Sequence, residues 1–221
     1  EKIIEVDCFE EATRYASDIL INQSIELDLE MNIALTGGRF GLHLVKNLNF
    51  SDLHTQRLNI FQTDERFVPP TGNDSNQFAL MSEIIKFNSD INYETFFFDT
   101  NLSAIESMIN MKETLERKRI DSFDCVFLSL GEDGHLAGDF HTSDYHFGKF
   151  SWTEQSPKPP KKRISFSASW LAKSKITILA IFGNEKTSAL RKFLSKDGMH
   201  SSILESSNLV ILKDKKIIIC T

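Results

Sequence analysis

Short apolar runs alternate with segments of helical spacing along most of the 221 residues. The apolar runs have the length of buried strands and cover 33–35, 58–61, 125–130, 176–181 and 209–212. Between them, apolar residues recur every three or four positions in 10–27, 42–48, 76–85, 104–116 and 186–194. Strands that alternate with helices in this way form a parallel sheet with helices on both faces. We therefore predict an α/β protein, and the length suits one domain over 1–221.

Unusual polar loops follow four of these apolar runs. They are 36–38, 63–66, 131–135 and 183–186. In open parallel sheets, ligands bind at the carboxyl ends of the strands, so we expect the four loops to meet at one edge. The stretch 151–162 holds three of the five prolines and is predicted to be an irregular surface connection.

The charge pattern and the cysteines narrow the class of protein. The net charge is −6 and the two signs are interspersed, which argues against a nucleic-acid partner. No apolar run approaches the roughly 20 residues that cross a bilayer, and no secretory signal is visible at the N-terminus. Cys8, Cys125 and Cys220 are odd in number and lie outside any C-x-x-C motif. We expect a cytoplasmic protein without disulfides.

Two loops have features of anion sites. In ALTGGRFG (34–41), Gly37 and Gly38 separate a strand from a helix, whose N-terminal amides favour phosphate, although the spacing alone favours a tight turn that binds nothing. In FGNEKTSAL (182–190), Lys186 lies where a nucleotide-binding P-loop has its lysine, but Glu185 replaces the glycine that should precede it. ATP binding is thus disfavoured, and Lys186 reaches either solvent or a bound anion.

The stretch TDERFVPP (63–70) places charges of both signs at a strand end. Asp64 is a candidate acceptor for a ligand hydroxyl, and Arg66 is a candidate donor to a ligand oxygen. A solvated loop or an internal ion pair is the alternative. Just beyond, GNDSNQ (72–77) predicts a turn and a helix whose N-cap is Ser75 or Asn76.

The stretch GEDGHLAGDFH (131–141) and the residues after it carry the densest titratable chemistry. The potential metal ligands within 14 residues are Asp133, His135, Asp139, His141, Asp144 and His146. Their spacing matches no established ligand pattern, so metal binding is disfavoured. A histidine beside an acid, in a glycine-bounded loop at a strand end, suits a general base. Covalent serine or cysteine catalysis lacks its motifs.

In this order and spacing, five motifs resemble the 6-phosphogluconolactonase family, which shares a superfamily with glucosamine-6-phosphate deaminase. They are LTGG (35–38), DERFVPP (64–70) with DSN (74–76), FDCVFLSLGEDGH (123–135), SPKPPKKRISFS (156–167) and FGNEK (182–186). The resemblance implies a three-layer α/β/α sandwich with a Rossmann-like, mostly parallel sheet. It also implies metal-free and cofactor-free hydrolysis of 6-phospho-D-glucono-1,5-lactone to 6-phosphogluconate, in the oxidative pentose phosphate pathway. The expected partner is this small phosphosugar lactone, and the expected state is a monomer or a weak homodimer.

The resemblance also implies roles for individual residues. His135 would deprotonate the attacking water, Asp133 would orient the imidazole or contact substrate hydroxyls, and Arg66 would stabilise developing negative charge. The expected substrate-binding residues are Gly37, Gly38, Arg39, Asp64, Asn76, Arg163 and Lys186, of which the two glycines, Arg163 and Lys186 would surround the 6-phosphate.

Two stretches depart from the family pattern. Many members have Ser-Thr-Pro where this chain has 39–41, so Arg39 either replaces the missing hydroxyls or points away. Members usually read Thr-Ala-Ser-Leu-Phe-Pro where this chain has 136–141, and Asp139 is a new charge there. Two alternatives therefore stay open: a deaminase/isomerase reaction, which 156–163 disfavours, and a non-catalytic protein that binds a sugar phosphate.

Overall fold

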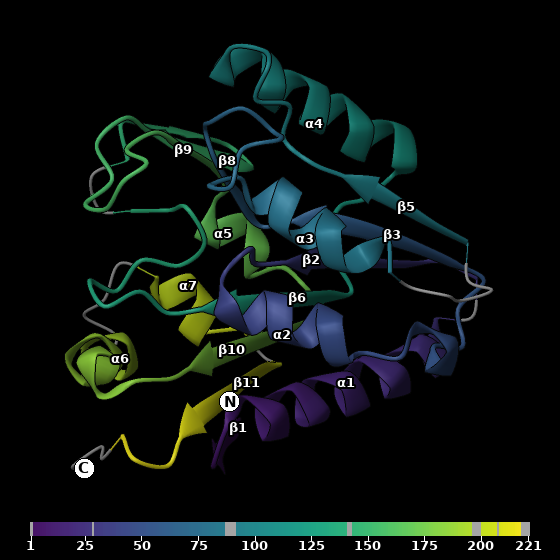
Figure 1. Cartoon of the computed structure of the whole chain (residues 1–221), viewed down its shortest axis with the longest axis vertical. Coiled ribbons are helices and arrows are strands. Elements are labelled where there is room, and N and C mark those ends of the chain that lie inside the picture. Colours follow the sequence, from purple (N-terminus) through teal and green to yellow (C-terminus); the bar gives the residue numbers. More distant parts are fainter. Residues whose placement is uncertain are drawn as a thin grey trace.

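A seven-stranded sheet forms the centre of the computed structural model, which describes residues 2–27, 29–86, 92–140, 143–195, 200–206 and 208–217 (Figure 1). All neighbouring strands are parallel, in the order β1-β11-β10-β6-β2-β3-β5. Their bounds are β1 (Lys2–Val6), β2 (Met31–Leu35), β3 (Arg57–Gln62), β5 (Asn92–Phe96), β6 (Cys125–Ser129), β10 (Ile176–Ile181) and β11 (Leu209–Asp214). The five expected strands are all present. The additional strands β1 and β5 lie at the two edges, where partial exposure removes the need for a long apolar run.

Helices cover both faces of this sheet, as predicted. On one face lie α1 (Phe9–Glu26), α2 (Arg39–Asn47) and α3 (Asn76–Ile84). On the other lie α4 (Ala104–Lys118), α5 (Ala168–Leu171), α6 (Thr187–Leu194) and α7 (Ser201–Leu204). Successive strand residues alternate between the two cores, as Ile33 and Ala34 do. The three-layer α/β/α sandwich is therefore confirmed, and none of its described helices is both long and apolar enough to cross a membrane.

Helix α2 begins three residues before the predicted start. Gly38 is its N-cap in an extended conformation, and Gly41 lies in its first turn. A Cβ on Gly41 would lie 1.7 Å from the carbonyl oxygen of Thr36. The glycine therefore lets the helix begin directly against the end of β2, which brings the α2 N-terminus to the sheet edge.

A second sheet of four antiparallel strands stands beside the first, in the order β4-β9-β8-β7. Its strands are β4 (Asp64–Arg66), β7 (Tyr145–Phe147), β8 (Phe150–Thr153) and β9 (Arg163–Phe166). The prediction of an irregular surface connection over 151–162 is wrong in its first part, because 150–153 is a fully buried strand. The residues of this strand alternate between apolar and polar over only four positions, directly before the proline- and lysine-rich stretch on which the prediction rested.

Candidate active site

The four polar loops converge at the point where the strand order reverses. The chain continues from β2 through β3 to β5 in one direction, then returns to place β6 on the other side of β2. The loops after β2, β3, β6 and β10 all contribute to one cavity of about 320 Å³ at the carboxyl ends of the strands. This is the position at which open α/β sheets bind their ligands. The predicted convergence is confirmed.

His135 and Asp133 form the titratable centre of this cavity. His135 Nδ1 lies 2.5 Å from Asp133 Oδ1, and both side chains are partly exposed to the cavity. The hydrogen bond to His135 lowers the pKa of Asp133 from 3.8 to about 2. The carboxylate is thus ionised at neutral pH and holds the imidazole by Nδ1, which leaves the other ring nitrogen for a ligand.

Two glycines make this close pairing possible. Gly131 donates its N–H to the carbonyl of His135 (2.8 Å), which closes the loop. A Cβ on Gly131 would lie 2.2 Å from His135 Nδ1 and 2.7 Å from Asp133 Oδ1. Gly134 has φ of +91°, a conformation that side chains other than glycine rarely adopt. The sequence indicated a bent loop here, but the need for an open space beneath the imidazole is visible only in three dimensions.

The residues after His135 support the imidazole from the side. The Phe140 ring stacks at 4.4 Å between centroids, tilted by 32°, against the His135 ring. Asp139 is buried outside the cavity lining, where its carboxylate accepts the Ala168 N–H (2.9 Å). Its charge therefore serves a structural contact.

The candidate metal ligands that the structure describes do not gather around one point. Within the ranges that the structure describes, no group of three His, Cys, Asp or Glu side chains gathers to hold an ion. His141 lies outside the described residues. Asp144 accepts the Glu154 N–H (2.8 Å), and His146 lies 3.7 Å from Asp139 at the surface.

A buried carboxylate that the sequence analysis missed organises the β4 side of the cavity. Glu65 accepts the backbone N–H groups of Asn76 (2.6 Å) and Gln77 (2.7 Å) at the start of α3. Burial raises the pKa of Glu65, and these backbone donors act in the opposite direction. Of the two predicted N-cap candidates, Ser75 is the N-cap, and its side chain accepts the Phe78 N–H. The acid in TDERF thus fixes the helix start at which Asn76 enters the cavity lining.

The predicted ligands Asp64 and Asn76 contact each other. Asn76 Nδ2 donates to the carboxylate (3.2 Å) and to the backbone carbonyl (3.0 Å) of Asp64. Gly37 lies behind Asn76, because a Cβ there would lie 2.2 Å from Asn76 Cγ. Gly37 is not among the residues lining the cavity, whereas Gly38 is. The structure thus places Gly37 as a spacer that gives Asn76 its position.

Two arginines lie on the same side of the cavity as Asp64 and Asn76. Arg66 is partly exposed and donates to the carbonyl of Asp74 (3.2 Å). Arg163 is buried and donates to the Ser156 hydroxyl (3.4 Å) and to the carbonyls of Lys158 (3.3 Å) and Pro159 (3.5 Å). Burial lowers the pKa of Arg163, and Asp64 partly offsets this effect. Arg163 thereby holds the proline-rich segment as one wall of the cavity.

The opposite side holds Lys186 and Arg39. Lys186 Nζ donates to Ser129 Oγ (3.2 Å) at the end of β6. Burial lowers the pKa of Lys186, and the positive charge of Arg39 adds to that effect. The Arg39 guanidinium lies over the Phe9 ring, 5.7 Å from its centroid. Two cations thus face a shared space beside the N-terminus of α2, a place that favours an anion.

The charge balance of the lining points to the same ligand class. The cationic side chains are Arg39, Arg66, Lys158, Arg163 and Lys186, against the carboxylates Asp64, Glu132 and Asp133. Lys158 and Glu132, which the sequence analysis did not single out, pair at 3.0 Å. A cationic excess within a chain of net charge −6 is a local feature that selects negatively charged ligands.

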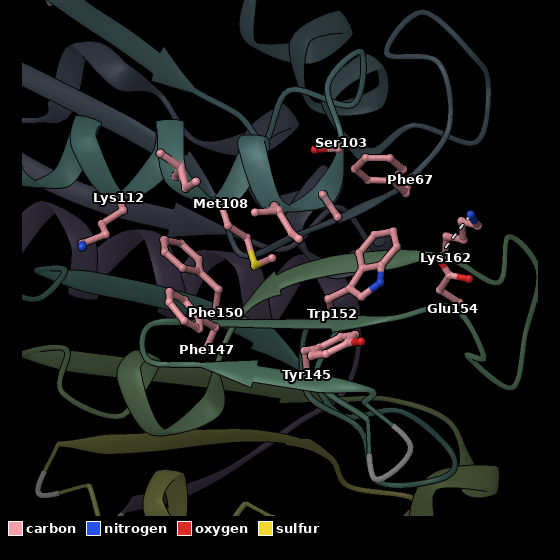
Figure 2. Close-up of a pocket in the computed structure, with 13 residues that line it drawn as sticks. Phe67, Ser103, Met108, Lys112, Tyr145, Phe147, Phe150, Trp152, Glu154 and Lys162 are labelled. Carbon is pink, nitrogen blue, oxygen red and sulfur yellow. Dashed lines mark ion pairs between the residues drawn. The ribbon is translucent and has the colours of Figure 1, made fainter.

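A larger cavity of about 550 Å³ lies elsewhere, between α4 and the antiparallel sheet (Figure 2). Its lining is mainly aromatic and aliphatic, with Met108, Tyr145 and Trp152 directed toward it. Its Lys162 and Glu154 pair with each other at 3.3 Å. This cavity lacks the converging polar groups of the strand-end site, so size alone does not identify the active site.

Comparisons with known proteins place this geometry in context. The sequence pattern of the family described as glucosamine-6-phosphate isomerases/6-phosphogluconolactonase matches residues 9–211. A protein of Borreliella burgdorferi named 6-phosphogluconolactonase is 27% identical over 219 residues, which cover 88% of each chain. One of Thermotoga maritima with the same name is 30% identical over 166 residues, 73% of this chain and 74% of its own.

Solved structures share the fold. A 6-phosphogluconolactonase from Thermotoga maritima superposes with a TM-score of 0.81 at 20% identity, over 96% of this chain and 98% of its own. A monomeric glucosamine-6-phosphate deaminase superposes with a TM-score of 0.78 at 18% identity, over 98% of both chains. The same fold therefore accompanies both names, and the fold alone does not separate the two reactions.

Proposed function

The chain belongs to the glucosamine-6-phosphate isomerase/6-phosphogluconolactonase family, and from this premise we propose that it is the lactonase of that family. The reaction is hydrolysis of 6-phospho-D-glucono-1,5-lactone to 6-phosphogluconate, in the oxidative pentose phosphate pathway. The curated relatives named 6-phosphogluconolactonase support this activity. The observation that carries the mechanism is the His135–Asp133 pair, which opens onto a cavity with an excess of cationic side chains.

The proposed chemistry begins at the imidazole of His135. Ionised Asp133 holds the Nδ1–H, so the Nε2 lone pair is available to accept a proton from water. The water oxygen then bonds to the lactone carbonyl carbon, and the carbonyl π electrons move onto its oxygen. When this tetrahedral intermediate collapses, the bond to the ring oxygen breaks and the ring oxygen receives the proton from His135. The products are a sugar hydroxyl and a carboxylic acid, which releases its proton to solvent and becomes the carboxylate, with no net redox change.

Arg66 is the proposed donor to the developing oxyanion. Its guanidinium is held at one end by the Asp74 carbonyl while its side chain lines the cavity. Preorganised donors of this kind stabilise charge that appears only in the transition state. Asp64 and Asn76, which fix each other, are the proposed contacts for substrate hydroxyls.

The phosphate group is proposed to bind between Lys186 and Arg39, at the N-terminus of α2. Burial destabilises the ammonium of Lys186, and a phosphate dianion would relieve this cost. Gly38 supplies a backbone without a side chain at the helix start. Arg39 takes the place of the hydroxyl donors that the family pattern has there. Arg163 contributes positive charge and maintains the wall formed by 156–160.

The deaminase reaction is the competing candidate, because a structurally similar protein carries that name. The segment held by Arg163 favours the lactonase, since the sequence motif 156–163 resembles the lactonase family and disfavours the deaminase.

The free thiols of Cys8 and Cys125 suit a reducing compartment, and we place the enzyme in the cytoplasm.

The test is a direct comparison of substrates. Lactone generated immediately before the assay is expected to be consumed well above its spontaneous rate, while glucosamine-6-phosphate is not deaminated. His135→Ala is expected to lower turnover by about 10²–10⁴-fold, the usual contribution of a general base. His146→Ala, a surface histidine outside the cavity, is the matched control and is expected to retain activity. Normal lactone turnover in His135→Ala would remove this residue from the mechanism.

A further inference from the structure

The turn that follows His135 is pinned to the antiparallel sheet. Asp139 donates its N–H to the carbonyl of Leu136 (3.0 Å), and Ala137 has φ of +53° between them. Gly138 donates its N–H to Ser165 Oγ (3.0 Å), and a Cβ on Gly138 would lie 3.1 Å from Ser165 Cβ. The turn therefore packs tightly against β9, although these residues depart from the family pattern.

Asp139 provides the second anchor of this turn. The residue is 4% exposed, and Oδ2 accepts the Ala168 N–H at the start of α5 (2.9 Å). The other oxygen, Oδ1, has no hydrogen-bond partner among the described residues, and His146 Nδ1 lies 3.7 Å from it. Burial of a carboxylate is costly, so we expect the hydrogen bond between Asp139 and Ala168 to have a specific structural role.

The next residue, Phe140, connects this anchor to His135. Phe140 is buried, and its N–H donates to Ser143 Oγ while its carbonyl accepts the Ser143 N–H, both at 3.0 Å. Its ring is the lateral contact of the His135 imidazole. Asp133 restrains one ring nitrogen of His135, but a single hydrogen bond leaves the tilt of the ring free. The Phe140 face restricts that tilt.

We infer that Asp139 is a positioning residue: its hydrogen bond to Ala168 holds the turn 136–139, and thereby keeps Phe140 against the imidazole of His135. This inference rests on the proposed lactonase function of His135. It assigns a purpose to a charge that replaces the leucine usual in the family.

The test compares Asp139→Leu with Asp139→Asn. The leucine variant cannot accept the Ala168 N–H, and a misplaced base costs rate, so kcat is expected to fall about 10-fold with KM unchanged. Asparagine keeps an oxygen that accepts the same N–H, so this variant is expected to recover most of the lost kcat. His146→Gln should retain full kcat, because the contact of His146 with Asp139 is long, at 3.7 Å, and the His146 side chain is exposed.

A spectroscopic readout separates positioning from general destabilisation. The imidazole resonances of His135, assigned by their absence in His135→Ala, are expected to shift in Asp139→Leu and to stay in place in Asp139→Asn. Phe140→Leu should shift the same His135 resonances. It should also change the pH profile of kcat in the same direction as Asp139→Leu does. Equal thermal unfolding midpoints would show that the fold persists.

Several results would overturn the inference. These are unchanged kcat and His135 resonances in Asp139→Leu, failure of Asp139→Asn to recover activity, and a loss in His146→Gln as large as that in Asp139→Leu. A wild-type protein without lactonase activity would instead refute the proposed function, and the resonance comparison would still decide the positioning role of Asp139.

Discussion

Replacement of Gly131 by alanine is expected to disable catalysis while leaving the fold intact. The added Cβ would lie 2.2 Å from His135 Nδ1 and 2.3 Å from Cε1. Carbon contacts are normally about 3.5 Å or longer, so the ring must retreat by roughly 1 Å. Gly131 does not have the positive φ of Gly134, so its backbone accepts alanine without strain. The imidazole, rather than the main chain, is therefore the part that moves.

The size of the effect follows from this displacement. A shift of about 1 Å in a catalytic group can cost on the order of 100-fold in rate, or about 2.7 kcal/mol in the activation free energy. Loss of the hydrogen bond between Asp133 and His135 would lower the rate further. The expected result is a fall in kcat of about 100-fold with little change in KM, because Lys186, the proposed phosphate contact, lies on another loop. The assay is proton release from freshly generated lactone, corrected for spontaneous hydrolysis.

Gly148→Ala is the matched control for this substitution. Gly148 has φ of +60° between β7 and β8, and a Cβ there would meet nothing within 4 Å. Alanine in this left-handed conformation is expected to cost about 1–2 kcal/mol of folding stability while leaving kcat unchanged. Wild-type kcat in a folded Gly131→Ala protein would refute the reasoning, as would an equal loss of kcat in both variants.

Three further predictions concern binding, pH and metal dependence. Lys186→Ala should raise KM for the lactone and leave kcat nearly unchanged in steady-state kinetics, since a phosphate anchor binds ground and transition states similarly. The pKa of Asp133 is lowered from 3.8 to about 2 in the folded state, so its contribution to stability is present above pH 3.8 and is lost as pH falls toward 2. Acid unfolding followed by circular dichroism should therefore depend less on pH between 4 and 2 in Asp133→Asn than in the wild type. EDTA should leave turnover unchanged, and a loss that zinc or magnesium restores would revive a metal role.

The central part of the fold could be predicted from the sequence because it depends on local patterns. The apolar run 176–181 coincides with β10, and the helical spacing in 76–85 gives α3 with its N-cap at Ser75. The edge strands β1 and β5 were missed, because partly exposed strands need no apolar run. Strand β8 was missed because its alternation of apolar and polar residues spans only 150–153, next to a proline-rich stretch.

The sequence predicted the titratable residues of the candidate site but not the residues that hold them in place. Titratable residues at strand ends, such as His135 and Lys186, stand out in the sequence because they interrupt apolar patterns. The residues that position them do not stand out. Glu65 looks like one of several loop charges, and Phe140 looks like an ordinary core residue. Their roles depend on contacts with Asn76 and with the imidazole of His135, which the sequence pattern does not express.

The sequence by itself determined the class of fold, the order of the strand-end loops and the acid–imidazole pair, because each of these depends on patterns among residues that are neighbours in the chain. Only the tertiary structure decided that β2 and β6 are neighbours, so that the loops holding Gly38 and His135 lie side by side in the cavity. It also decided that Gly37 is a spacer and that Asp139 is an anchor. The physical reason is that parallel strands pair across long separations in the chain, and the free energy of that pairing comes from burial shared by both faces of the sheet rather than from any single segment.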